Sequence, residues 1–221
     1  MSVRIAPSVL SADLSRLKEE IAAVQAGGAD WIHVDVMDGH FVPNLTFGVP
    51  LIRALRRLTE LPLDVHLMVE HPEEYIAPFA DAGATVFTFH AEATVHAQRH
   101  LAAVRERGMR AGLALNPASP LASVGEVLDD LDVVLLMTVN PGYGGQAYIP
   151  ASTEKIRRCR ALLDEHGSRA ALEVDGGITV DTIGTAWEAG ADTFVAGTAV
   201  FGAAAATDAI RALRRRCAVR V

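Results

Sequence analysis

Residues 33–44 read HVDVMDGHFVPN and follow an apolar lead-in over residues 29–32. His33, Asp35 and Met37 fall at alternate positions, with Val34 and Val36 between them. In an extended strand, this period of two sends the first three side chains to one face and the valines to the other. We therefore expect a buried strand that carries an imidazole, a carboxylate and a thioether on a face that has a chemical use.

Composition sets the class of protein to which this strand belongs. The chain has 221 residues, and 50% of them are hydrophobic, which predicts a soluble globular protein with a substantial core. A net charge of −7 argues against a general nucleic-acid binder. No apolar run reaches the roughly 18 residues that a membrane span needs. The two cysteines, Cys159 and Cys217, form neither a disulfide framework nor a metal pattern, which fits the reducing cytoplasm.

Around the opening stretch, short β-rich runs alternate with longer helical patterns through the whole chain. The strands are expected at residues 4–10, 31–36, 63–69, 85–90, 111–115, 133–139, 171–175 and 193–196. The helices are expected at residues 13–26, 49–59, 72–82, 94–107, 120–129, 151–166, 179–189 and 204–216. Eight near-equal units without a linker predict a single-domain α/β protein, a (β/α)8 TIM barrel over residues 1–221. An open doubly wound sheet is the alternative.

In a barrel, active sites form where the strands end, and polar residues lie at three predicted strand ends. His33 and Asp35 would share this edge with His66 in "LDVHLMV" and with Asp175 in "LEVDGGI". Two imidazoles and two carboxylates are ligands for a divalent ion such as zinc, iron, manganese or cobalt. The alternative is that each is a hydrogen-bonded core residue or a helix cap. His90 closes "VFTFH" and is interpreted as a supporting or structural residue rather than a ligand.

Glycine-rich turns follow the last three predicted strands. They are "NPGYGGQ" at residues 140–146, "DGG" at 175–177 and "VAGTAVFG" at 195–202. Loops after strands seven and eight are the usual phosphate site of barrels, where backbone N–H groups bind the anion. Gly176, Gly177, Gly197 and Thr198 are therefore candidate phosphate-binding residues, although the same glycines could serve only as tight turns.

Lysine is scarce in a way that narrows the chemistry. Lys18 and Lys155 are the two lysines, and both fall inside predicted helices. No lysine therefore stands at a strand end for a Schiff base or a lysine-assisted decarboxylation.

The motifs "IAPSVLSAD", "HVDVMDGHFVPN", "DVHLMV", "TFHAEA", "MTVNPGYGGQ", "EVDGGI" and "VAGTAVF" together resemble those of the ribulose-phosphate 3-epimerase family, in the family's order over about residues 4–202. The resemblance implies a ribulose-phosphate-binding barrel. It also implies a cytoplasmic isomerase of the pentose phosphate pathway that interconverts D-ribulose 5-phosphate and D-xylulose 5-phosphate. One divalent metal ion per subunit and a homo-oligomer, a dimer or a hexamer, follow from the same resemblance.

The family's functional residues map onto this chain position by position. The resemblance implies metal ligands at His33, Asp35, His66 and Asp175, with Asp35 and Asp175 as the two acid/base groups. It implies substrate contacts at Ser8, Met37, His66, Met68, Met137, Gly142, Tyr143, Gly144, Gly145, Asp175, Gly176, Gly177, Gly197 and Thr198. Thr198 stands where the family more commonly has serine, and Tyr143 stands where phenylalanine is frequent.

These parts suit a two-aspartate epimerisation at C3 through a metal-stabilised enediolate, because one carboxylate can remove a proton and the other can deliver one to the opposite face. The loops at residues 38–48 and 140–150 are candidates to close over the substrate. Three alternatives remain: a 3-epimerase of another ketose phosphate such as allulose 6-phosphate, a metal-dependent aldolase or synthase, and a barrel that only binds phosphorylated ligands.

Overall fold

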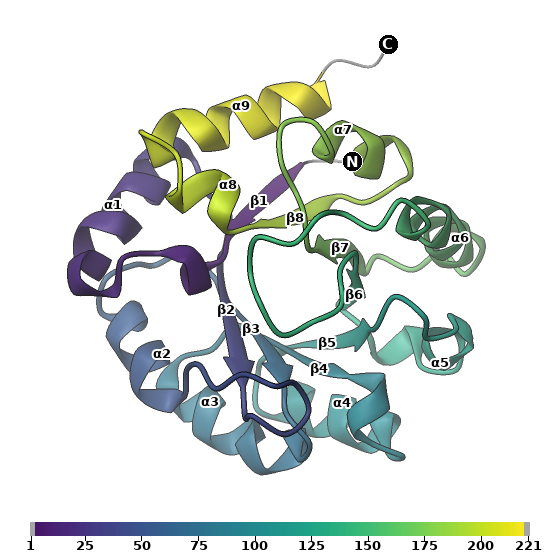
Figure 1. Ribbon diagram of the computed structural model, residues 1–221. Helices are drawn as coiled ribbons and strands as arrows, with labels where there is room; N and C mark the ends of the chain where they lie inside the picture. Colours follow the sequence, from purple (N-terminus) through teal and green to yellow (C-terminus); the bar gives the residue numbers. More distant parts are fainter. Residues whose placement is uncertain (1–2, 219–221) are drawn as a thin grey trace.

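The computed structural model describes residues 3–218 and contains eight parallel strands wrapped into a nearly closed barrel (Figure 1). The predicted (β/α)8 architecture is confirmed. The strands are β1 (Arg4–Pro7), β2 (Ile32–Met37), β3 (Leu63–Met68), β4 (Val86–His90), β5 (Arg110–Leu115), β6 (Val133–Met137), β7 (Ala171–Asp175) and β8 (Thr193–Ala196).

The barrel closes between its first two strands. The hydrogen-bonded order runs β1-β8-β7-β6-β5-β4-β3-β2, so β1 and β2 are the two edges of the sheet. A single parallel bridge between Ser8 and His33 joins them. The first strand is shorter than the predicted residues 4–10, because the Ser8 side chain accepts a hydrogen bond from the Leu10 N–H and turns residues 9–11 into a 3₁₀ helix.

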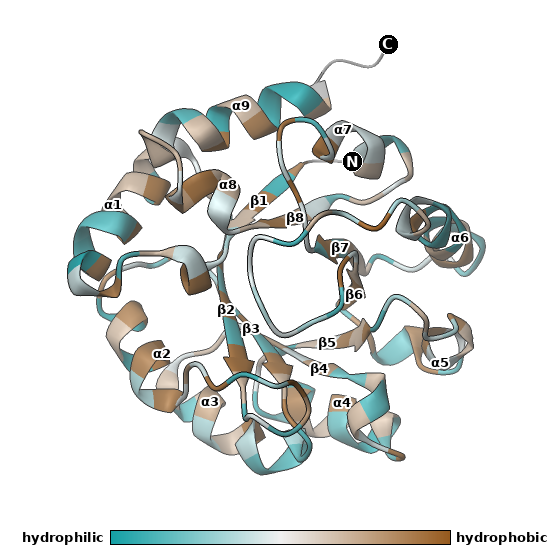
Figure 2. Ribbon diagram, in the orientation of Figure 1, coloured by the Kyte–Doolittle hydropathy of each residue, from teal (hydrophilic) through white to brown (hydrophobic). Residues whose placement is uncertain are grey.

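Helices surround the barrel and carry both hydrophobic and hydrophilic residues (Figure 2). They are α1 (Leu17–Gly27), α2 (Val49–Arg56), α3 (Ile76–Ala82), α4 (Ala97–Glu106), α5 (Ala122–Gly125), α6 (Ser152–Glu165), α7 (Ile183–Glu188), α8 (Thr198–Phe201) and α9 (Ala206–Ala218). The helix predicted at residues 120–129 is wrong in extent: α5 stops at Gly125, and a separate 3₁₀ turn covers Leu128–Asp130. None of the helices within residues 3–218 has the length and apolar character of a membrane span.

Side chains alternate along the strands between the layer under the helices and the inside of the barrel. Outward-facing residues such as Val34, Val65 and Phe89 pack with Ile52 and Leu101 of the helices in one continuous hydrophobic core. A second cluster lies inside the barrel and extends from its N-terminal end to Val195 near the pocket: Ala6, Trp31, Val86, Val133, Ala171 and Val195. The Trp31 ring there lies between two guanidinium groups, with Arg4 at 5.6 Å and Arg110 at 6.0 Å.

Toward the C-terminal strand ends, several of the remaining inward positions are polar, beside apolar ones such as Leu135 and Met137. Register places His33 of β2 beside Asp64 of β3, and Asp35 beside His66. Both histidines and Asp64 are fully buried. Polar groups at this depth need partners within the barrel, because burying an unpaired polar group is costly. The fold thus concentrates titratable side chains on its axis.

Asp192 holds the β8 end of the barrel to its neighbours, and its removal should be costly. Its carboxylate lies 2.9 Å from both the Arg4 and the Arg160 guanidinium groups. We expect Asp192→Ala to lower the free energy of unfolding by about 2–4 kcal/mol, because the enclosed Arg160 guanidinium and the partly exposed Arg4 guanidinium both lose this carboxylate, as do the Leu172 N–H and the Thr193 hydroxyl. Urea denaturation measures the change.

The matched control is Asp164→Ala, since Asp164 also pairs with Arg160, at 3.5 Å, from a side chain that is 60% exposed. We expect a loss below about 1 kcal/mol for this exposed pair. Equal losses in the two variants would contradict the role assigned to Asp192.

Candidate active site

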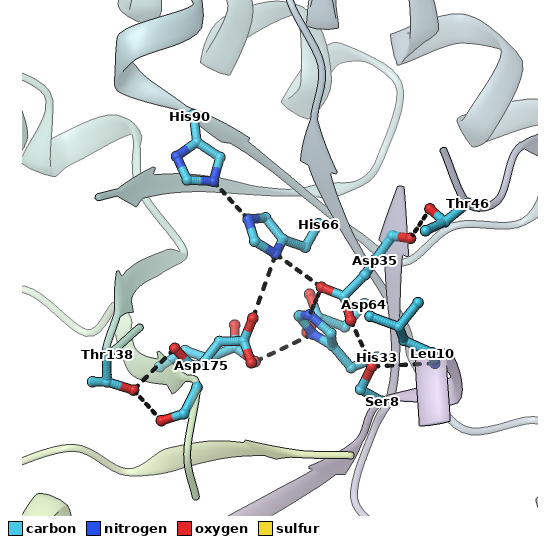
Figure 3. A network of polar contacts seen from close by, with 12 residues as sticks. Ser8, Leu10, His33, Asp35, Thr46, Asp64, His66, His90, Thr138 and Asp175 are labelled. Carbon is cyan, nitrogen blue, oxygen red and sulfur yellow. Dashed lines mark hydrogen bonds and ion pairs between the residues drawn. The ribbon is translucent and has the colours of Figure 1, made fainter. Parts of the chain in front are cut away.

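Four of the sequence-predicted residues meet at the C-terminal end of the barrel. His33, Asp35, His66 and Asp175 each offer one ligand atom, and these atoms all lie within 4.8 Å of one another. The His33 Nε2 and His66 Nδ1 atoms lie 3.3 Å and 3.2 Å from Asp35 Oδ1, and His66 Nδ1 is 3.8 Å from Asp175 Oδ2 (Figure 3). The predicted cluster therefore forms, with two members on β2, one on the neighbouring strand β3 and the fourth on β7.

Asp35 is the most constrained member of the cluster. Its Oδ2 atom accepts a hydrogen bond of 2.5 Å from the Ser8 hydroxyl, while Oδ1 faces the two imidazoles. Its backbone carbonyl accepts from the Thr46 hydroxyl, whose oxygen also accepts from the Met37 N–H. The returning loop after β2 thus fixes the strand end, and Ser8 fixes the carboxylate.

A second acidic pair lies beneath the cluster. Asp64 Oδ2 is 2.5 Å from His33 Nδ1, and Glu173 of β7 is 3.8 Å from the same nitrogen. When His33 is neutral, a carboxylate that accepts from Nδ1–H leaves the Nε2 lone pair facing the cluster. Asp64 and Glu173 lie on the same alternating faces of β3 and β7 as His66 and Asp175 but deeper in the strands, and neither was predicted from the strand ends.

Neighbouring charges oppose the effect of burial on the pKa of His33 and Asp35 and reinforce it for Asp175. Burial disfavours charged His33, but the Asp35 and Asp64 charges overcome this and hold the His33 pKa well above its ordinary value. Burial alone would raise the pKa of Asp35, yet the charge and hydrogen bond of His33 and the hydrogen bond of His66 hold it far below normal. Burial and then the Asp35 charge raise the pKa of Asp175 to about 7. The two carboxyls therefore differ in proton affinity, which one acid and one base require.

The donor set fits a divalent metal ion. Ligands about 2.0–2.2 Å from one ion lie about 3 Å apart in octahedral geometry and about 3.4 Å apart in tetrahedral geometry. The separations of 3.2 and 3.3 Å match these spacings, and the separation of 3.8 Å is a few tenths of an ångström longer. Two nitrogens and two oxygens suit a transition metal better than calcium or magnesium, which take oxygen ligands.

A pocket of about 270 Å³ opens above the cluster. Predicted residues that line it are Ser8, Asp35, Met37, Met68, Met137, Gly142, Tyr143, Gly144, Gly145, Asp175, Gly176, Gly177, Gly197 and Thr198. The structure does not place His33 and His66 in the lining, because both lie buried beneath the carboxylates. The substrate contact predicted for His66 is therefore not seen as a pocket-lining position, because the ring lies under the pocket floor.

Some lining residues were not foreseen: Leu10, Ser11, Val139, Pro141, Gln146, Ile178, Thr179, Val195 and Ala199. Ser11 is the most informative of them, since its hydroxyl lies 3.4 Å from that of Thr198. Residues 4–10 were expected to form one continuous strand. The turn that brings Ser11 to the pocket has only one weak signal in the sequence, namely Ser8 at the position that caps the turn.

Two loops meet over the pocket. The Asn44 side chain of the β2–α2 loop donates a hydrogen bond of 2.8 Å to the Gly142 carbonyl of the β6–α6 loop. Asp38 holds the first loop in shape, because its carboxylate accepts from the backbone N–H groups of His40, Phe41 and Glu70. Tyr143 is 57% exposed at the tip of the second loop. These loops can cover a bound molecule.

Close backbone approach after β7 requires glycine. Gly177 has φ +65°, and a Cβ atom there would lie 2.3 Å from the Tyr148 backbone nitrogen. Gly176 has φ +120°, and a Cβ there would meet Val139. Glycine at these two positions thus lets the turn after β7 pack directly against Val139 and Tyr148, which follow β6.

Comparison with known proteins places this site in a family. The model of the "Ribulose-phosphate 3 epimerase family" matches residues 4–201. The chain is 53% identical to ribulose-phosphate 3-epimerase 1 of Cupriavidus necator, over 91% of this chain and 86% of the relative. It is 50% identical to the ribulose-phosphate 3-epimerase of Bacillus subtilis, over 96% and 98%. The chain belongs to the ribulose-phosphate 3-epimerase family. It is accordingly an epimerase, as the sequence resemblance predicted.

Solved structures of lower identity share the fold. KGPDC from Streptococcus mutans superposes with a TM-score of 0.72 at 16% identity, over 99% of this chain and 98% of that one. Orotidine 5'-phosphate decarboxylase from Pyrococcus horikoshii gives 0.69 at 17% identity, over 99% and 100%. At these identities, the likeness concerns the barrel alone.

Gly177→Ala tests the close approach after β7. We expect this substitution to lower the free energy of unfolding by about 1–3 kcal/mol and to reduce epimerase kcat/KM, because the new methyl group meets the Tyr148 backbone at a positive φ. Chemical denaturation and steady-state kinetics measure both effects. Gly184→Ala is the control, since nothing lies within 4 Å of a Cβ at that helical glycine. A Gly177→Ala protein as stable and active as the control would refute the steric role.

Proposed function

We propose that this protein interconverts D-ribulose 5-phosphate and D-xylulose 5-phosphate by epimerisation at C3, with Asp35 and Asp175 as the acid/base pair. One observation carries the proposal: both carboxyls line a pocket whose floor is a nitrogen–oxygen ligand cluster. Family membership supports the substrate, because the relatives at about 50% identity are named for this epimerisation.

The same cluster would hold one divalent ion through His33, Asp35, His66 and Asp175. When bound there, a divalent cation supplies Lewis-acid stabilisation of negative charge on the sugar oxygens. Zinc, iron, manganese and cobalt all accept this ligand set. The Ser8 hydroxyl, at 2.5 Å from Asp35, and Asp64, at 2.5 Å from His33, would keep these two ligand side chains in place.

The two aspartates would perform the proton transfers. The hydrogen at C3 is acidic because its removal gives an enediolate shared with the C2 carbonyl. Asp35 on β2 and Asp175 on β7 reach the pocket from different strands, so that one can remove the C3 proton and the other can return a proton from the opposite side. Inversion then needs no rotation of the intermediate.

The other end of the pocket would bind the phosphate. Backbone N–H groups near Gly177 and Gly197, with the hydroxyls of Thr198 and Ser11, form a neutral polar cradle there. Met37, Met68 and Met137 line the part near the carboxylates and would present polarizable, non-protic surface to the planar intermediate. Water would be excluded by the loops that Asn44 connects.

The remaining predictions concern the setting of the enzyme. A role in the pentose phosphate pathway, a cytoplasmic location and a homo-oligomeric state, dimer or hexamer, all stay predictions from the family resemblance. Allulose 6-phosphate is the competing substrate, and comparing kcat/KM for the two sugar phosphates decides between them.

Loss of either aspartate should stop inversion at C3 while exchange of the C3 hydrogen with solvent continues. We expect Asp35→Asn and Asp175→Asn each to lower kcat for ribulose 5-phosphate by about 100- to 10,000-fold, the usual contribution of a positioned acid or base. In D₂O, each variant should still exchange the C3 hydrogen of one epimer without inverting it, because one carboxylate remains. A coupled assay and NMR of recovered sugar measure the two effects.

Asp181→Asn, at an exposed position before α7, is the matched control and should behave as wild type. Direct transfer of the C3 hydrogen to product within one turnover in D₂O would mean that a single base acts, and would exclude the two-aspartate scheme.

Metal should stabilise the folded protein as well as support turnover. We expect chelation to abolish activity and Zn²⁺, Mn²⁺ or Co²⁺ to restore it. At 100 times Kd, the bound ion should add about 2.7 kcal/mol to the free energy of unfolding. This increment should vanish in His33→Ala and persist in His96→Ala, since His96 is exposed on the outer surface. Full activity after exhaustive chelation, verified by elemental analysis, would rule out the metal.

A further inference from the structure

His66, the second imidazole of the cluster, contacts a buried histidine that in turn contacts the partly exposed carboxylate of Glu92, and the proposed reaction uses neither residue. His66 Nε2 lies 2.8 Å from His90 Nε2, and both rings are fully buried (Figure 3). One hydrogen must lie between these nitrogens, because two bare nitrogens repel each other and two N–H groups clash. Each ring therefore constrains the tautomer of the other.

Glu92 decides which ring donates. Its Oε2 atom is 3.2 Å from His90 Nδ1, whereas Oε1 accepts hydrogen bonds from the Asn116 N–H, at 2.8 Å, and from the Ser119 hydroxyl. An ionised carboxylate only accepts, so the hydrogen of neutral His90 lies on Nδ1. His90 Nε2 is then a bare acceptor, and the hydrogen between the rings belongs to His66 Nε2.

The consequence appears at the other side of the His66 ring. With its hydrogen on Nε2, neutral His66 turns a lone pair at Nδ1 toward Asp35 Oδ1, at 3.2 Å, and Asp175 Oδ2, at 3.8 Å. Asp35 pulls the other way, since a carboxylate next to Nδ1 favours a hydrogen there. Glu92 and His90 oppose that pull from the far side of the ring.

We propose that Glu92 and His90 are positioning residues that hold His66 in the tautomer whose Nδ1 lone pair can bind a divalent cation. The inference rests on the proposed metal site. His33 has the equivalent arrangement in shorter form, with Asp64 directly on the nitrogen that faces away from the cluster. Both imidazoles are thus oriented by a carboxylate, one directly and one through a second imidazole.

We call the contacts from Glu92 through His90 to His66 the relay. Glu92→Gln tests it, because glutamine has nearly the same shape as glutamate. The Asn116 and Ser119 donors retain the amide oxygen, so the amide NH₂ faces His90 Nδ1 and donates to it. Both rings should then switch tautomer, and His66 should carry its hydrogen on Nδ1. Nitrogen-15 NMR of the chelated protein should show a bare His66 Nδ1 in wild type and a protonated one in the variant.

Metal affinity provides the second readout. By competition with a chromophoric chelator, Co²⁺ should bind Glu92→Gln about 10- to 100-fold more weakly than wild type, the usual cost of losing a partner behind a metal ligand. Ser119→Ala loosens the same loop but leaves the carboxylate to accept from His90, and should change Co²⁺ affinity less than about threefold. Glu106→Gln, at an exposed position on α4, controls for the lost charge.

The outcomes separate the relay from the metal site. Tight Co²⁺ binding by both wild type and Glu92→Gln would overturn the relay and leave the metal site intact. Equal weakening in Glu92→Gln and Ser119→Ala, or no tautomer switch in the NMR spectra, would also overturn it. Wild type that binds no Co²⁺ would remove the proposed metal site, and the inference with it.

Discussion

Side-chain alternation in a closed parallel barrel is the constraint on which the rest of this structure depends. Every second residue must point to the axis, where neither the helices nor solvent can satisfy it. In the N-terminal half, the inward positions are apolar and pack around Trp31. In the C-terminal half they include His33, Asp35, Asp64, His66 and Glu173, whose polar groups need partners inside the barrel, as Ser8 is for Asp35 and His90 is for His66. The same geometry that would destabilise an isolated polar group thus creates a concentrated ligand cluster.

The chemistry of the pocket divides along the same axis. Regular strands hold the carboxylates and imidazoles, whose separations must be maintained for the proposed proton transfer and ligation. Loops hold the glycines and hydroxyls, where an anion needs close backbone approach. Gly177 illustrates the difference, because its role comes from the space a missing side chain leaves beside Tyr148.

Much of this arrangement could be predicted from the sequence, and the failures have physical causes. Alternation located His33, Asp35, His66 and Asp175, since a period of two fixes the face on which a residue lies. It does not fix depth along the axis, so Asp64 and Glu173 were overlooked on the same faces. His90 was interpreted as supporting or structural, but its contact with Glu92 went unnoticed. The Asn44–Gly142 contact joins residues 98 positions apart and leaves no local signal.

The packed residues around Trp31 also determine from which end of the barrel the pocket can be reached. Within residues 3–218, the Trp31 indole, with the Arg4 and Arg110 guanidinium groups over it, fills the end of the barrel opposite the pocket. The barrel is therefore a blind tube with its mouth among the loops. Substrate and product must therefore enter and leave through the same opening. The hydrogen bond from Asn44 to Gly142 joins the two loops over this opening and therefore lies on the path of both molecules.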